Sequence, residues 1–443
     1  MKTQVAKAVL AASVIMGNAA FSLAQSPTAP LADSGEQQVS RNSIENLNYL
    51  GGDVSMPPFT ESLIGVNSAY RRAMFNKGLA LRFLTQVQYA QNTLDAPVAA
   101  DAQSYAGQRY YGAAMTEAIF TADLRQLHLN HAQLNITVPW NWVSWRPAGP
   151  KTFDIWSLSL YKKFGEDRVE VKAGYNGNNL DFVGLQVGGS TANGAMGVYA
   201  VLPFEVGLAY YPLTAPTLNV KFNGPKWTYL KSAAQRSIDA AGGPEDVKRN
   251  HVGLRFDPHG DKLLLINELG YRRHASQDMN DIWFRAGYMH NSTPYANVST
   301  GQKQPGNFCS YALIDYQLRK PDPTHANHGL YAGGSAMTVP EALNPYARYY
   351  EARVYQEAPF RSRPGDVLSF VASRTGYSKL LTNTLAGEGK AAWNGTISLT
   401  GGYTVRVSRG SYINLGLSHI NGPAITPRAP NALVFTANWA TYF

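Results

Sequence analysis

Alternation of apolar and polar residues along many short segments is the feature that most restricts how this chain can fold. Side chains of a β-strand point in turn to opposite faces, so each segment predicts a strand with one apolar and one polar face. Turn-forming sequences such as Ser408–Gly410 separate several of them. The clearest segments are Leu79–Tyr89, Ala132–Val138, Val169–Tyr175, Leu218–Phe222, Ile397–Val407 and Ile413–Leu417.

The medium that covers the apolar faces decides between two all-β folds. In a soluble sandwich the apolar faces meet each other, whereas in a membrane barrel they meet lipid and the polar faces line the lumen. The barrel is favoured because the polar faces carry many long charged and amide side chains, and because short turns alternate with long connections such as 291–307. Aromatic clusters suited to bilayer interfaces occur at Trp140, Trp142, Trp145, Tyr210, Tyr211, Trp227, Tyr229, Tyr349 and Tyr350.

The N-terminus is typical of an exported protein. Lys2 and Lys7 lie at the start of a weakly apolar run, and Ser22–Ala24 supplies small residues for cleavage after Ala24. We therefore expect a signal peptide over 1–24, a polar periplasmic segment over 25–62 and an outer-membrane barrel domain over 63–443. Cys309 is the only cysteine, which excludes a disulfide within the chain.

The C-terminal segment supports the barrel interpretation. It alternates along Leu433, Phe435, Ala437, Trp439 and Thr441, and the chain ends on Phe443. A last strand that ends on an aromatic residue resembles the assembly signal of bacterial outer-membrane barrels. This resemblance implies the barrel assembly machinery as a partner, reached through Phe443.

Several short motifs, in order and spacing, resemble the carbohydrate-selective porin family (OprB). The matching residues near the first strand are Gly65, Arg71, Lys77 and Gly78, although the family's Asp, Trp and paired Gly are replaced there. The later motifs are Asp154–Trp156, Lys172–Gly174, Ile314–Arg319, Arg361–Val367 and Pro430–Val434. The resemblance extends from about Gly65 to Phe443.

What this resemblance implies is a transmembrane antiparallel β-barrel of about 16 strands, with short periplasmic turns and long extracellular loops. Such a protein lets mono- and small oligosaccharides diffuse passively through the bacterial outer membrane. Because sugars carry many hydroxyl groups, we expect charged and amide side chains on the polar faces to contact them. The candidate lumen-lining residues are Arg82, Gln86, Gln88, Arg168, Glu170, Lys172, Glu268, Arg272 and Arg406, with Glu351 and Arg353 in a more mixed strand.

The formal net charge of +9 fits a pore that favours neutral or anionic solutes, and it equally fits contact with lipopolysaccharide phosphates at the outer rim. The basic residues are dispersed rather than clustered, so nucleic-acid binding is not expected. Outer-membrane lipid is the expected surrounding, and both a monomer and a homotrimer are compatible with the sequence.

No catalytic, cofactor or metal motif stands out. His325 and His328 lie in a predicted loop without a carboxylate at ligand spacing, and Ser418 and His419 are adjacent, which puts them on opposite faces of a strand. An enzyme is therefore not expected. Two other functions stay open, namely a barrel that exports polysaccharide and a secreted β-protein that binds glycans.

Overall fold

The structure, a computed structural model, describes residue 47 and residues 57–94, 98–99, 103–145, 152–183, 201–258, 260–321, 325–426 and 431–443. The signal peptide expected over 1–24 lies outside the described residues, as does most of the segment expected over 25–62.

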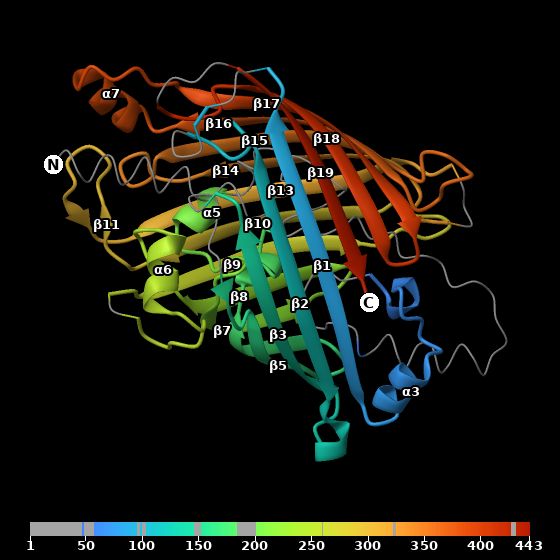
Figure 1. The fold of residues 1–443 in the computed structure, drawn as a ribbon. Coiled ribbons are helices and arrows are strands. Elements are labelled where there is room, and N and C mark those ends of the chain that lie inside the picture. The colour runs from blue at the N-terminus through green and yellow to red at the C-terminus, as the bar shows by residue number, and fades with distance from the viewer. Residues whose placement is uncertain are drawn as a thin grey trace.

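Antiparallel strands form one sheet of 17 members, of which sixteen are long and one, β4 (Thr152–Phe153), has two residues (Figure 1). The long strands are β1 (Leu79–Asn92), β2 (Tyr111–Asp123), β3 (Ala132–Val143), β5 (Ser157–Phe164), β6 (Val169–Asn176), β7 (Ala215–Asn223), β8 (Thr228–Arg236), β9 (Leu263–Arg273), β10 (Ile282–Asn291), β13 (Asn307–Arg319), β14 (Gly329–Thr338), β15 (Tyr346–Glu357), β16 (Val367–Tyr377), β17 (Gly395–Ser408), β18 (Ser411–Asn421) and β19 (Ala432–Tyr442).

The sheet closes on itself into a barrel. β1 pairs with β2 on one side and with β19 on the other, in a register that places Leu84 opposite Tyr442 and Asn92 opposite Val434. Closure leaves no unpaired edge among the long strands, which is what a sheet in lipid requires because the hydrocarbon core offers no hydrogen-bond partners. The predicted all-β antiparallel barrel is confirmed.

Apolar side chains cover the outside of the barrel, and polar side chains face its interior. On β7, β18 and β1, the outward-facing Leu218 and Leu417 are 48% exposed and Val87 is 43% exposed. Their strand neighbours Asn219 and Gln86 point inward and are buried. The alternation in the sequence therefore matches the two faces of one wall, with the apolar face turned toward lipid.

The two rims differ in the length of their connections. One rim has short turns at 165–168, 224–227 and 409–410, and it also carries the start of β1 and the end of β19. The other rim has long connections, including 177–214, 237–262 and 378–394. The predicted difference between a rim of short turns and a rim of long loops is therefore present. In outer-membrane barrels the short turns face the periplasm.

Helical segments are short and lie before β1 or in the connections between strands. They are η2 (Phe59–Glu61), α3 (Ala69–Phe75), η4 (Leu124–Leu127), η6 (Asn178–Leu180), α5 (Val201–Glu205), α6 (Gly243–Arg249) and α7 (Lys379–Gly387), and β11 (Tyr295–Ala296) pairs with β12 (Lys303–Gln304) in a separate two-stranded sheet. Among the described residues, no helix combines the length and apolar character needed to cross a bilayer.

The aromatic clusters divide between the two faces, which differs from the interface girdle expected for all of them. Trp140, Trp227 and Tyr350 are exposed on the outside, as a girdle requires, whereas Tyr349 and Tyr211 are buried. The physical reason for Tyr349 and Tyr350 is that consecutive residues of β15 point to opposite faces. One residue of such a pair therefore points into the interior of the barrel.

Candidate functional site

The inner wall carries a group of six charged residues on strands β8 to β15, here called the charged belt. It contains three cations and three anions, and each of the six side chains is buried from bulk solvent by its neighbours. The members are Lys231, Glu268, Arg285, Asp315, Glu351 and Arg353.

Glu268 is the centre of one half of the belt. Its carboxylate lies 2.9 Å from Nζ of Lys231 and accepts hydrogen bonds from the hydroxyls of Tyr229 at 3.0 Å and Tyr311 at 2.8 Å. Each tyrosine ring lies over the glycine that pairs with it on the next strand, since Tyr229 stands opposite Gly270 and a Cβ there would lie 1.9 Å from the ring. Glycine is thus required for the tyrosine to reach the carboxylate.

Arg353 is the centre of the other half. Its Nε and Nη2 donate to the two carboxylate oxygens of Asp315, at 2.8 and 2.5 Å, and its Nη1 donates to Glu351 at 2.6 Å. Such a bidentate pair has a fixed geometry and is stronger than a hydrogen bond between neutral groups. Nη1 also donates to the hydroxyl of Ser335 at 2.9 Å. Arg353 therefore joins β13, β14 and β15 across the inner wall.

Arginines flank an indole between these two halves. The guanidinium carbon of Arg285 lies 3.7 Å from the ring centroid of Trp283, and that of Arg272 lies 4.5 Å away. The indole Nε1 of Trp283 donates to the hydroxyl of Tyr229 at 3.0 Å. A cation over an aromatic face is favourable, more so where water is excluded. These contacts place two cations against Trp283, of which Arg285 belongs to the belt and Arg272 pairs with Asp281 at 3.7 Å.

The described parts of the connection between β6 and β7, residues 177–183 and 201–214, fold into the barrel and are together called the inserted loop. Polar side chains of the wall hold it in place. Nζ of Lys172 donates to the carboxylate of Asp181 at 2.9 Å, Nδ2 of Asn291 donates to the carbonyl of Val206 at 2.6 Å, and Nε2 of Gln235 donates to the carbonyl of Gly207 at 3.1 Å. The wall therefore fixes the loop at several points along its length.

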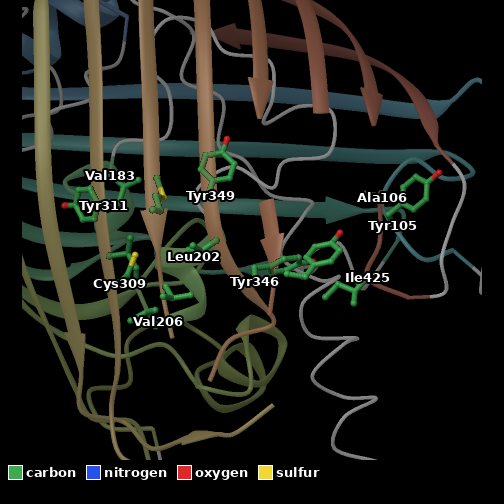
Figure 2. Packing of buried hydrophobic residues seen from close by; sticks show 14 of the residues in the cluster. Tyr105, Ala106, Val183, Leu202, Val206, Cys309, Tyr311, Tyr346, Tyr349 and Ile425 are labelled. Carbon is green, nitrogen blue, oxygen red and sulfur yellow. The ribbon is translucent and has the colours of Figure 1, made fainter. Parts of the chain in front are cut away.

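Apolar side chains of the inserted loop pack against the same wall. Leu202, Val206 and Val183 join one buried cluster with Cys309 and Tyr311 of β13 (Figure 2). Figure 2 shows these residues as one group between the strands and the loop helix. Cys309 is buried there, as its strand-like surroundings in the sequence predict. Because the inserted loop fills part of the interior, it narrows the lumen beside the charged belt.

A second segment far away in sequence covers the wall near the short-turn rim. It is called the N-terminal rim segment and comprises Pro57–Ile64. The ring of Phe59 is 2% exposed and lies 4.1 Å from the guanidinium of Arg82 and 5.0 Å from that of Arg71. The carboxylate of Glu61 forms an ion pair with Arg406. The rim segment is therefore attached to β1 through Arg82, to β17 through Arg406, and to β19 through the N–H of Leu63, which donates to the carbonyl of Tyr442 at 2.8 Å.

The predicted lumen residues fall into different positions. Arg82, Gln86, Lys172 and Glu268 are buried on the inner wall, and Gln88 is half-buried on β1. Glu170 is half-buried on β6 and accepts hydrogen bonds from Tyr161 at 2.5 Å and Asn223 at 2.6 Å. Arg272 stacks on Trp283, and Arg406 pairs with Glu61. Arg168 lies in the turn before β6 and is exposed.

Glu351 and Arg353, which were predicted from a more mixed strand, both belong to the belt. Three other members were not among the predicted residues: Lys231, Arg285 and Asp315. Asp315 lies in the motif Ile314–Leu318 and Arg285 lies two residues after Trp283 on an alternating strand. Their inward direction could have been read from that alternation, whereas their partners on other strands could not.

Comparison with known proteins identifies the family. The family model for carbohydrate-selective porins of the OprB type matches residues 85–439. The chain belongs to the OprB family. Among solved structures, the high-pH structure of Pseudomonas putida OprB is similar with a TM-score of 0.73 and 14% identity, covering 86% of this chain and 98% of that chain. The low-pH structure of the same protein gives a TM-score of 0.56 and 13% identity, with the same two coverages. No curated protein sequence matches the chain.

As a member of the OprB family, the protein is an outer-membrane carbohydrate porin. The likeness to the high-pH structure shows the barrel fold at this low identity. Family and fold both indicate a channel, whose work is done by the shape and the lining of the lumen.

Proposed function

We propose that sugars cross this porin through the space between the inserted loop and the charged belt. The observation that carries the proposal is the balance of the belt. Lys231, Arg285 and Arg353 stand against Glu268, Asp315 and Glu351, and five of these six residues form ion pairs of 2.9 Å or less with a partner of opposite sign. The belt therefore offers many donors and acceptors with little net charge.

This lining suits neutral polyols better than ions. A sugar hydroxyl both donates and accepts, so it can exchange bonds with water for bonds with tyrosine, arginine and carboxylate groups. Because the belt has as many cations as anions, an ion would meet little net charge of opposite sign there. Because the polar groups are already held by one another, sugar binding is expected to stay weak, which permits release.

The inserted loop supports passage of small solutes. It is held to the wall at Asp181, Val206 and Gly207, so it restricts the width available. A polymer under export would need a wider path, and this observation therefore favours sugar uptake over the polysaccharide-export alternative. The predicted lumen residues Gln86 and Gln88 are proposed to face the same path, and Arg82 is proposed to reach it only where the rim segment does not cover it.

We infer a further partner from the closure of the last strand on the first. Phe443 follows the last strand, and its backbone N–H donates to the carbonyl of Phe83 at 2.8 Å. The final strand thus completes closure on β1, which supports its recognition by the barrel assembly machinery. Contact with lipopolysaccharide, the oligomeric state and the absence of catalysis stay proposals.

Swelling of proteoliposomes tests the proposal. Glucose and other neutral monosaccharides are expected to enter, with rates that fall steeply as solute size increases. Gluconate, an anion close to glucose in size, is expected to enter more slowly. The variant Glu351→Gln gives the belt one excess positive charge and should narrow the difference between glucose and gluconate. Glu388→Gln, in the connection after α7, is the matched control. Absence of swelling with every monosaccharide would overturn the proposal.

A further inference from the structure

The outer face of the barrel is hollowed along one diagonal line. A trough of about 720 Å³ crosses strands β14 to β19, and nearly all of its lining is apolar. It lies on the lipid-facing side, because its lining side chains Leu368, Phe370 and Leu417 are among the exposed apolar residues. We propose that this trough is a binding site for one anionic phospholipid of the periplasmic leaflet.

Strand register defines the shape of the trough. One row of paired residues forms its lower side, and a second row, two residues farther along each strand, forms its upper side. The lower row is Leu330, Gln356, Leu368, Tyr403 and Leu415; the upper row is Val354, Phe370, Gly401, Leu417 and Phe435.

The hollow itself comes from Gly401. No heavy atom lies within 4 Å of the place where its Cβ would be, and its backbone has no positive φ that would call for glycine. Phe370 and Leu417 pair with it on the two neighbouring strands. The missing side chain therefore leaves a gap between large apolar groups. The backbone conformation at this position does not require glycine.

The dimensions of the trough match one acyl chain. Five strands separated by ~4.8 Å give a row about 19 Å long. One leaflet of a hydrocarbon core ~30 Å thick is about 15 Å deep. The lower row starts at Leu330 and Leu368, each the second residue of its strand at the short-turn rim. The upper row ends at Phe435, from which β19 continues for seven residues to Tyr442 at the short-turn rim, so the row rises away from that rim. An acyl chain in the trough would thus run from the periplasmic rim toward the middle of the bilayer.

Positive charge gathers at the rim end of the trough. Arg319 is exposed and pairs in register with Leu330, the first residue of the lower row. In the turn 358–366, the exposed ring of Phe360 lies 6.4 Å from the ring of Tyr403, and the exposed Arg361 follows it. An apolar channel that ends at two exposed arginines is complementary to an acyl chain joined to a phosphate.

The carboxylate described at this end of the trough is buried and already paired. Among the described residues of the turns 320–328 and 358–366, Asp366 is the only carboxylate. It is 1% exposed, and it accepts hydrogen bonds from Arg363 and from the hydroxyl of Tyr403. Asp366 is therefore not available to neutralise Arg319 or Arg361. This charge pattern favours an anionic lipid over a second copy of the barrel, which would place the same arginines against each other.

Native mass spectrometry of the full porin released from detergent tests the site. With added phosphatidylglycerol, the wild type is expected to keep one lipid, and to bind phosphatidylcholine more weakly. Because each basic side chain near an anionic headgroup strengthens binding about fivefold, the double variant Arg319→Gln/Arg361→Gln should lose most of the preference for phosphatidylglycerol. Lys226→Gln, an exposed cation in the turn between β7 and β8, is the matched control and should leave the preference unchanged.

The apolar part of the site is tested separately. Gly401→Phe should fill the trough and reduce retention of both lipids, whereas Ala312→Phe, at an exposed outward position of β13, should not. Heat-modifiable gel mobility checks that each variant has folded. If Gly401→Phe does not fold, the double arginine variant still tests the site, because it does not alter the lipid-facing wall. Equal lipid retention by Gly401→Phe and wild type would overturn the proposal. So would a wild-type porin that keeps no lipid, or wild-type oligomers that disappear in Gly401→Phe, since the latter would make the trough an interface between copies.

Discussion

Two parts of the inner wall stabilise their buried charged side chains in different ways. On strands β8 to β15, the charged side chains of the belt are paired with one another, as Arg353 is with Asp315 and Glu351. On the wall near β1, Arg71 and Arg82 instead lie against Phe59, which belongs to the N-terminal rim segment. The first wall is completed by its own strands, and the second by a segment that precedes the barrel.

This difference has a consequence for what each wall can do. Belt residues are fixed by neighbours in the sheet, so they keep their positions as long as the barrel is closed. Arg82 is buried under Phe59, so contact between Arg82 and a solute depends on the rim segment. The belt is thus a permanent lining, whereas solute access to the wall near β1 depends on how firmly the rim segment is attached.

Removing the central cation of the belt should have the largest effect. Arg353→Met leaves the carboxylates of Asp315 and Glu351 buried near each other without compensation, which typically costs about 3–5 kcal/mol. The urea midpoint for unfolding in lipid vesicles should fall accordingly. The control is Arg348→Met on the same strand, because Arg348 is exposed and pairs with Glu341 at 3.1 Å. A pair of that kind contributes about 0–1 kcal/mol, so equal midpoints for the two variants would contradict the permanent lining.

Removing the ring of the rim segment should change access more than global stability. Phe59→Ala deletes two cation–π contacts, each worth ~1–2 kcal/mol when shielded from water. The rim segment should then be cleaved faster by an added protease, and neutral sugars should enter proteoliposomes faster because Arg71 and Arg82 are uncovered.

Phe83→Ala is the matched control for this change. Phe83 neighbours Arg82 on β1 but faces outward and is exposed, so its loss should leave both protease cleavage and sugar entry near the wild-type rates. If Phe59→Ala behaves like Phe83→Ala, the rim segment does not cover a functional surface.

The sequence was sufficient to predict the directions of side chains but not their partners. Period-two alternation is local, so it placed Arg82, Lys172 and Glu268 on the inner face, where the structure has them. The pairing of Arg353 with Asp315 joins strands 38 residues apart, and it depends on register and strand tilt, which alternation does not encode. Arg168 shows a second limit, because the strand begins one residue after it and the side chain lies in an exposed turn.

Segments without periodicity were the harder part. The region 25–62 was interpreted as a polar periplasmic segment, yet its described residues Leu47 and Phe59 pack with Ala80 of β1. A single aromatic residue in a Pro-rich stretch gives no local signal of where it docks. The inserted loop is similar, since its anchors at Asp181 and Gly207 become visible only once the barrel brings Lys172 and Gln235 to them.

A pH effect is expected from the inserted loop. Glu205 of α5 has both carboxylate oxygens shielded from solvent, and burial raises the pKa of this carboxyl well above its usual range, against a smaller opposing effect of the Tyr346 peptide group. The protonated form therefore fits the packed loop. Loop packing should be favoured below the raised pKa and lost as the pH rises through it. Conductance of the wild type should change on alkalinisation, and Glu205→Gln should not show that change. An identical pH profile for the variant would contradict the role of Glu205.

The smallest effect is expected from the ion pair that ties the rim segment to β17. The side chains of Glu61 and Arg406 are 16% and 32% exposed, and partly exposed pairs contribute about 0–1 kcal/mol and weaken with salt. Glu61→Gln should therefore accelerate protease cleavage of the rim segment slightly at low ionic strength, with the difference from wild type vanishing at about 1 M salt, where the Debye length is ~3 Å. Phe59→Ala, in contrast, should stay susceptible at every salt concentration, because the lost contacts of Phe59 with Arg71 and Arg82 are shielded from water and salt screens them little. A salt-independent effect of Glu61→Gln would mean that the ion pair acts through the packing of Phe59. The ion pair and the Phe59 contacts would then not be independent attachments of the rim segment.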